Sequence, residues 1–200
     1  MLFTFLEFLA AFSGIVSVWY SRKNDILVYP TGLLSVVLYT YICFHSKLYA
    51  DAGLNGYYTI MNFVGWINWA KKKGDEYVYP VTYCNWKEWI YGLTVFILIT
   101  VILYFSLKHL TDSTVPLGDS IVSGSSATAM WWMTRRKIEN WYAWLLADLI
   151  AVPLFFYKGL YLTVIQFCVF LVLATMGLIY WIKLERQHRL EYTTEQISQY

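Results

Sequence analysis

The sequence predicts an all-α integral membrane protein in which seven transmembrane helices form two parallel three-helix repeats joined by one linker helix. Three observations predict this fold. Hydrophobic residues make up 58% of the 200-residue chain and charged residues only 14%, a balance that favours the bilayer over water as the solvent. The chain divides into seven mainly apolar segments of about 20 residues, the length that a helix needs to cross a bilayer. The first half also matches the second half at a constant offset.

The connections between the apolar segments are short, except for KKKGDEYVYPVTYCNWKE after the third, and a polar tail ends the chain. The seven helices are expected at 3–20, 26–44, 52–70, 89–107, 116–134, 138–157 and 160–182. We therefore expect a single transmembrane domain over 1–200, made of repeat one (about 3–70), the linker helix (about 89–107), repeat two (about 116–182) and a cytosolic tail (183–200).

Basic residues alternate between the two sides of these seven spans, with twelve on one side and three on the other. Because basic loops stay in the cytoplasm, the split predicts an N-terminus outside the cell and a C-terminus inside. The fifth span, PLGDSIVSGSSATAMWWMT, is rich in small and hydroxyl residues and is the weakest by hydropathy. Without this span the basic residues would no longer fall mainly on one side of the membrane, so the charge distribution favours a fifth helix. The three basic residues on the outer side are Lys47, Lys108 and Lys158.

A shift of 112 residues aligns the two repeats without a gap. The matches include Ser13 with Ser125, Trp19 with Trp131, Gly65 with Gly177, Trp69 with Trp181 and Lys71 with Lys183. Each copy has three helices, and the single helix between them gives both copies the same orientation in the membrane. Parallel repeats of this kind occur in transporters whose substrate site lies near the midplane, between the repeats. The repeat is therefore the first indication of function.

The segment NWYAWLLAD places an acid, Asp148, about halfway along the sixth span. A charge near the bilayer centre is costly and typically marks a binding site or pathway. Trp141, Trp144 and Asp148 follow i, i+3, i+7 spacing and share one helix face, with Asn140 one residue off that stripe. Indole faces beside a carboxylate suit a flat organic cation. The alternatives are a protonated or helix-paired structural acid and interfacial anchoring of Trp141.

The third span carries Asn55, Tyr58, Asn62 and Trp66 on one face. Asn62 lies near mid-depth, where an amide needs a partner from a ligand or from another helix. Gln166 of the seventh span is a second amide that is costly to bury. The candidate substrate-binding residues are Trp144, Asp148, Trp141, Asn62, Tyr58, Trp66, Gln166 and Asn140.

Other functional classes lack support in the sequence. No histidine is placed as a base for a buried serine, and no GxxxxGK[ST] motif is present, so neither an enzyme nor an ATP-driven motor is indicated. Three widely spaced cysteines predict no metal site and no disulfide framework. A net charge of +2 does not suggest a nucleic-acid surface. We expect no cofactor, no metal and no nucleic-acid partner.

The segment IENWYAWLLADLIAVPLFFYKGLYLTVIQF, with its N-W-x-x-W-x-x-x-D core and K-G-L-Y-L-T turn, resembles the second repeat of the PnuC family of vitamin transporters. The stretch from Asn24 to Trp69 is similar to the family's first half, and the resemblance spans about 12–183. It implies seven helices in a 3+1+3 arrangement, like a SWEET sugar transporter. It also implies facilitated diffusion of nicotinamide riboside, by alternating access, across the inner membrane of a bacterium. A cytosolic kinase then traps the vitamin by phosphorylation.

The resemblance implies that aromatic and amide side chains of the middle helices bind the substrate. The N-W-x-x-W motif fixes Trp141 and Trp144, and the remaining positions map onto Asp148, Asn62, Trp66 and Gln166. The resemblance also leaves thiamine or another vitamin or nucleoside as alternative substrates, since relatives carry thiamine, riboflavin or deoxynucleosides. Thiamine is the second candidate, because an acid does not separate two cations, and neutral riboflavin is less favoured. The expected partners are a small cationic vitamin precursor, the lipid bilayer and the trapping kinase. The oligomeric state and proton coupling through Asp148 stay open.

Two further functional classes remain as alternatives. A receptor or assembly subunit without transport could dock a partner through the long loop from Lys71 to Trp89 and the polar tail. The duplicated, polar-lined midplane argues against this class, because docking does not need it. A membrane enzyme is disfavoured by the missing acid–base set.

Overall fold

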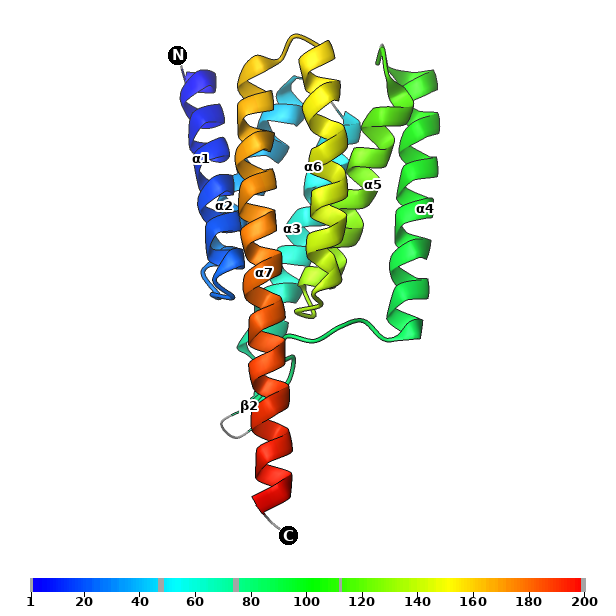
Figure 1. The fold of residues 1–200 in the computed structure, drawn as a ribbon. Coiled ribbons are helices and arrows are strands. Elements are labelled where there is room, and N and C mark those ends of the chain that lie inside the picture. The colour runs from blue at the N-terminus through cyan, green and yellow to red at the C-terminus, as the bar shows by residue number, and fades with distance from the viewer. Residues whose placement is uncertain (1, 47–48, 74–75, 112, 199–200) are drawn as a thin grey trace.

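The protein is described here by a computed structural model, which describes residues 2–46, 49–73, 76–111 and 113–198. Seven α-helices make up most of the described chain (Figure 1). They are α1 (Leu2–Arg22), α2 (Val28–His45), α3 (Tyr49–Ala70), α4 (Trp86–Leu110), α5 (Pro116–Met133), α6 (Glu139–Tyr157) and α7 (Tyr161–Ser198). The loop between α3 and α4 contains a two-stranded antiparallel hairpin of β1 (Lys72–Lys73) and β2 (Glu76–Tyr77).

The seven predicted spans each coincide with one helix, and the predicted fold class is confirmed. One boundary differs substantially. α7 continues to Ser198, so the polar tail expected after residue 182 is largely a helical extension that projects beyond the rest of the bundle (Figure 1). Strong helix formers fill the segment from Lys183 to Glu191, and neither glycine nor proline interrupts it. We call the end of the bundle from which α7 projects the basic end, since Arg22, Lys23, Arg135 and Lys183 lie there.

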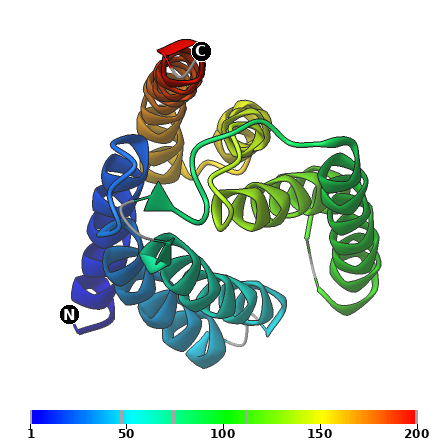
Figure 2. The same ribbon diagram turned by 90° about the horizontal axis from the view of Figure 1, so that it is seen from below.

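Six helices form a ring in the order α1, α2, α3, α5, α6, α7, and α7 closes it against α1 (Figure 2). α4 lies outside this ring and packs mainly on α5. The contact between α3 and α5 corresponds to the contact between α7 and α1 when the two repeats are exchanged. The repeats are therefore related by a pseudo-twofold axis along the bundle.

α5 shows why hydropathy underestimated the fifth span. By length and composition, four helices in the described part of the chain qualify as membrane spans, namely α2, α4, α6 and α7. α5 does not, yet most of its side chains are buried between its neighbours. A side chain at Gly124 would collide with Thr100 and the Phe96 carbonyl of α4. Because protein rather than lipid covers this helix, small and hydroxyl residues are favoured over large apolar ones.

The turns that end the first helix of each repeat have the same conformation. Among the described residues other than glycine, only Asn24 and Arg136 have a positive φ, 55° and 52°, and they are equivalent under the 112-residue shift. The backbone hydrogen bonds also correspond: Asn24 N–H donates to the Ser21 carbonyl, and Arg136 N–H donates to the Met133 carbonyl. Since a left-handed conformation is costly for a residue with a side chain, its recurrence at one register supports a common architecture of the two repeats.

Candidate substrate cavity

A cavity of about 290 Å³ lies inside the ring of six helices. Every ring helix contributes to its lining, through Gly14 of α1, Gly32 of α2, Asn62 of α3, Ser126 of α5, Trp144 of α6 and Gln166 of α7. The volume is near the lower end of the range of small-molecule sites, about 300–1,000 Å³. The cavity therefore lies between the two repeats and has the size for a small organic molecule.

Six of the eight predicted site residues line this cavity. They are Tyr58, Asn62, Trp141, Trp144, Asp148 and Gln166. Three come from one face of α6, as the i, i+3, i+7 spacing predicted, and the others come from α3 and α7. The fold brings together side chains that are more than 100 residues apart in the sequence, and their binding of a substrate stays a prediction.

The structure does not place Trp66 and Asn140 in the cavity lining. The face of α3 that packs into the bundle runs through Asn62, Gly65 and Trp69, which are all buried. Trp66 lies at the edge of this face and is 38% exposed. Asn140 is fully buried at the start of α6, where its amide donates to the Lys137 carbonyl. Because Asn140 lies one residue off the tryptophan stripe, its side chain contacts the turn between α5 and α6 and not the cavity.

Asp148 is the one charged side chain among the described residues of the cavity lining. It is only 3% exposed, and no hydrogen bond or ion pair joins it to another residue of the described chain. Trp141 also lines the cavity, and its buried indole N–H likewise has no hydrogen-bond partner among the described residues. An acid and a hydrogen-bond donor thus remain unpaired beside the same space.

The amide and hydroxyl groups of the lining connect the two repeats. The Asn62 side chain donates to the Tyr58 carbonyl of its own helix at 2.9 Å. The Tyr58 hydroxyl interacts with Ser126 of α5, and the Tyr39 hydroxyl of α2 interacts with Gln166 of α7. These contacts cross the interface between the repeats on both sides of the cavity.

Equivalent positions of the two repeats present different chemistry to the cavity. Trp144 and Asp148 of α6 correspond to Gly32 and Val36 of α2, while Asn62 of α3 corresponds to Ala174 of α7. At these positions repeat two thus supplies a carboxylate and a partly buried indole, and repeat one supplies the amide of Asn62. Sequence reasoning missed Gly32, Val36 and Ala174, although the 112-residue shift aligns each of them with a predicted site residue.

Two reciprocal tryptophan contacts close the cavity at the basic end. Trp69 of α3 donates from its indole to the Met133 carbonyl of α5 at 3.0 Å, and Trp181 of α7 donates to the Ser21 carbonyl of α1 at 3.1 Å. Both pairs are related by the 112-residue shift, and the two indole rings lie 5.8 Å apart between centroids. Ser21 and Met133 themselves line the cavity. Each repeat therefore holds the other through one indole at this end.

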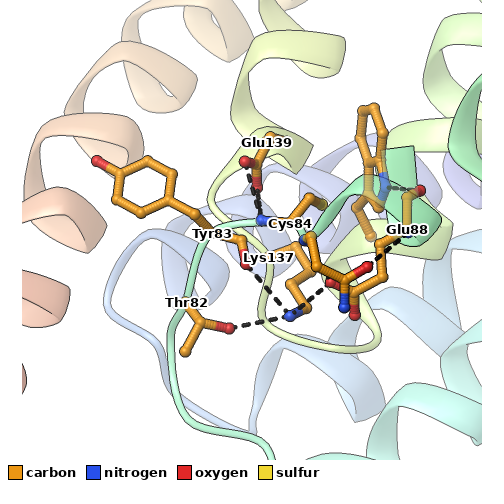
Figure 3. A network of polar contacts seen from close by, with 8 residues as sticks. Thr82, Tyr83, Cys84, Glu88, Lys137 and Glu139 are labelled. Atoms are coloured by element: carbon orange, nitrogen blue, oxygen red, sulfur yellow. Dashed lines mark hydrogen bonds and ion pairs between the residues drawn. The ribbon is translucent and has the colours of Figure 1, made fainter. Parts of the chain in front are cut away.

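The loop before α4 forms a strap, residues 79–85, across the turn between α5 and α6 (Figure 3). Thr82 accepts from Ile138 N–H and donates to the Arg136 carbonyl through its backbone, while Cys84 N–H donates to both carboxylate oxygens of Glu139 at 2.9 Å. Lys137 pairs with Glu88 at the start of α4 at 2.9 Å. The strap and α4 are therefore attached to repeat two.

Arg136 connects this strap to repeat one. Its guanidinium lies 4.4 Å from the Trp69 ring centroid and 4.3 Å from that of Tyr77, and it donates to the Tyr79 carbonyl at 2.9 Å. Burial lowers the pKa of Arg136 from its usual value, and the two ring faces compensate part of that cost. The basic end is thus sealed by contacts outside the cavity as well as by the paired indoles.

Comparison with known proteins supplies the class of function. Residues 4–183 match the family described as nicotinamide mononucleotide transporter. The chain is 23% identical to the nicotinamide riboside transporter PnuC of Escherichia coli (strain K12), over 92% of this chain and 87% of that protein. It is 25% identical to the riboflavin/roseoflavin transporter RibM of Streptomyces davaonensis, over 88% of this chain and 84% of that protein.

A solved structure agrees with this assignment. The crystal structure of the vitamin B3 transporter PnuC superposes with a TM-score of 0.71 and 26% identity, over 92% of this chain and 83% of that one. The family and the structural match consist of transporters, not enzymes, and the apolar helices make this a multi-pass membrane protein. Within the described residues, no cluster of three or more metal-ligating side chains occurs. The chain belongs to the PnuC family of membrane transporters, described as the nicotinamide mononucleotide transporter family.

Proposed function

We propose that this protein mediates facilitated uptake of nicotinamide riboside across the inner membrane of a bacterium. The observation that carries the proposal is the buried, unpaired Asp148 on the wall of a cavity between the repeats. A buried carboxylate without a partner costs several kcal/mol. A cationic ligand would supply the missing counter-charge, and both nicotinamide riboside and thiamine are cations.

The cavity lining favours a riboside over a phosphorylated nucleotide. No lysine or arginine occurs among the described residues that line it, so a phosphate would meet the carboxylate of Asp148 without a compensating cation. The names of the relatives include nicotinamide riboside, while the family description names the mononucleotide. The charge of the lining supports the riboside.

Trp144 is the best candidate for stacking on the ligand ring. Trp141 is held by protein contacts, since its ring packs edge-on against Trp181 at 5.5 Å and lies against Gly177. Trp144 is only partly buried and faces the same cavity. A flat cation lying on an indole face gains about 0.5–2 kcal/mol, in addition to the attraction of the carboxylate one turn further along α6.

The route of transport follows from the distribution of charge and from the two-repeat architecture. The excess of basic residues at the basic end supports a cytoplasmic location for that end and an N-terminus outside the cell. Uptake then requires the reciprocal tryptophan contacts to open, by rocking of one repeat against the other. A cytosolic kinase would trap the vitamin by phosphorylation and keep the gradient directed inward.

The test is uptake of radiolabelled nicotinamide riboside by proteoliposomes. The combined Trp144→Ala and Asp148→Asn variant should lose saturable uptake, whereas Trp86→Ala, which removes a 77% exposed tryptophan at the start of α4, should retain it. Unchanged uptake by the combined variant would refute the proposed site.

Thiamine and riboflavin are alternative substrates with specific support. Thiamine fits the same charge argument, and its side-by-side titration against nicotinamide riboside separates the two cations. Riboflavin is neutral, but the name of the relative RibM includes riboflavin, so riboflavin is tested in the same titration. A receptor or assembly subunit would show binding without flux in sealed proteoliposomes.

A further inference from the structure

Gly32 of α2 lies on the cavity wall at a point where an added side chain would displace its neighbours. A methyl group built on its backbone would lie 2.7 Å from the Asn62 amide oxygen and 2.9 Å from the Ser17 hydroxyl oxygen. Real side chains do not approach so closely, and the glycine is buried. The amide oxygen of Asn62 therefore occupies space that is available only because residue 32 has no side chain.

This packing orients the Asn62 amide on the cavity wall. One amide hydrogen donates to the Tyr58 carbonyl, and the oxygen lies against the backbone of α2. The Ser17 hydroxyl donates its proton to the Val28 carbonyl at 2.8 Å, so this proton is not directed at the Asn62 oxygen. An asparagine amide carries two N–H groups, and the second N–H has no partner among the described residues, so it is free to donate to a ligand. Asn62 would thus act as a hydrogen-bond donor.

The repeat shows why a glycine at this position matters for the shape of the cavity. Gly32 corresponds to Trp144 under the 112-residue shift, and both residues line the cavity. Where repeat two places its largest side chain, repeat one places none. The pseudo-twofold axis relates the two positions, and beside Gly32 the Asn62 amide takes the space that a side chain at residue 32 would fill.

We infer that Gly32 is a specificity-determining residue that positions Asn62 as a donor to an oxygen atom of the substrate. The preferred substrate then combines a flat cationic ring, which stacks on Trp144, with a carbonyl or hydroxyl oxygen that accepts from Asn62. This inference rests on the proposed function for the identity of the cation, but it concerns the second, uncharged half of the ligand.

The test is a double-mutant cycle of binding, measured by calorimetry on the detergent-purified full-length protein. Gly32→Ala should weaken binding about ten-fold or more, because it displaces Asn62 and leaves a ligand acceptor unpaired. Gly56→Ala on α3, where a methyl group meets nothing within 4 Å, is the matched control and should bind like the wild type. In an Asn62→Ala background, Gly32→Ala should have an effect of less than about three-fold, because the two residues act as one unit.

A shortened partner provides the rescue. In the Gly32→Ala and Asn62→Ser double variant, serine relieves the collision and still offers a donor, so binding should recover relative to Gly32→Ala alone. Wild-type affinity of Gly32→Ala would overturn the inference. The inference would also be overturned if Gly32→Ala weakened binding equally in the wild-type and Asn62→Ala backgrounds, since Gly32 would then act through helix packing only.

The choice of ligand keeps the two proposals apart. The cycle is run with whichever of nicotinamide riboside and thiamine binds the wild-type protein. Binding of thiamine alone would refute the proposed substrate, while the cycle would still decide on Gly32. Folding is checked by thermal unfolding of each variant. If Gly32→Ala alone is unstable, the affinity of the Gly32→Ala and Asn62→Ser double variant still tests the role of Gly32.

Discussion

Asp148 gives the sharpest test at the scale of single residues. Asp148→Asn keeps the size of the side chain and removes its charge, so binding of nicotinamide riboside or thiamine should weaken about ten-fold or more, since about 1.4 kcal/mol corresponds to a factor of ten. The control is Leu146→Ala on the same helix, where a 46% exposed leucine contributes nothing to the cavity. Isothermal titration would measure both, and unchanged affinity of the asparagine variant would exclude a counter-ion role.

Cys84 offers a second residue-scale prediction, outside the membrane spans. Burial, together with the nearby carboxylates of Glu139 and Glu88, raises the pKa of its thiol. Only the thiolate reacts readily with iodoacetamide, so at pH 8 Cys84 should react much more slowly than a free thiol, and faster as the pH rises. Glu139→Gln removes a negative charge, lowers this pKa and should speed the reaction.

The measurement needs a background in which Cys43 and Cys168 are replaced by alanine. Mass spectrometry then follows alkylation of Cys84 alone. Glu191→Gln on the exposed extension of α7 serves as the control and should leave the rate unchanged. A Glu139→Gln rate equal to that of the background would show that this carboxylate does not control the thiol.

At the scale of elements, the two repeats use the same device to pack their second and third helices. Tyr29 of α2 lies against Gly65 of α3, and Trp141 of α6 lies against Gly177 of α7. Alanine at either glycine would collide with the aromatic ring. Overpacking of this kind costs about 1–3 kcal/mol, so Gly65→Ala and Gly177→Ala should each lower the melting temperature by several degrees.

The control for this pair is Gly53→Ala, since nothing lies within 4 Å of that position, and it should be neutral or slightly stabilising. Thermal unfolding in detergent, followed by circular dichroism, measures all three. A melting temperature of Gly177→Ala at or above that of Gly53→Ala would contradict the packing described here.

The sealed basic end provides the prediction for the whole molecule. Trp69→Phe and Trp181→Phe each remove one indole hydrogen bond that joins the two repeats. A loss of about 1 kcal/mol corresponds to a roughly five-fold shift of a two-state equilibrium towards opening at this end. Because the contacts are reciprocal, the two variants should shift the equilibrium by similar amounts in the same direction.

A cysteine at Ser126, on the cavity wall, reports the shift in a background without native cysteines. A membrane-impermeant thiol reagent applied to inside-out vesicles should label it several-fold faster in either tryptophan variant. Trp86→Phe, at an exposed position, is the control. Faster labelling in only one of the two tryptophan variants would argue against a symmetric closure.

The local pattern of the sequence accounts for much of the fold. The length of the apolar segments predicted the seven helices, and the alternation of basic residues supported the weakly hydrophobic α5. The match of Trp69 with Trp181 indicated the repeat. Sequence missed the helical extension to Ser198 and the strap over Glu139, because both depend on contacts or propensities that hydropathy does not record. Helix periodicity placed Trp141, Trp144 and Asp148 on one face of α6.

The sequence by itself therefore determined the helices, their repeat and the polar side chains that face the interior, because each of these has a period or an offset that is visible along the chain. Only the tertiary structure decided which of these side chains share one cavity. It left Trp66 and Asn140 outside the lining of that cavity, because their orientation depends on how neighbouring helices pack, and it placed the Asn62 amide against Gly32. A residue without a side chain leaves no chemical signal in the sequence, and its effect appears only where another residue occupies the space that it leaves.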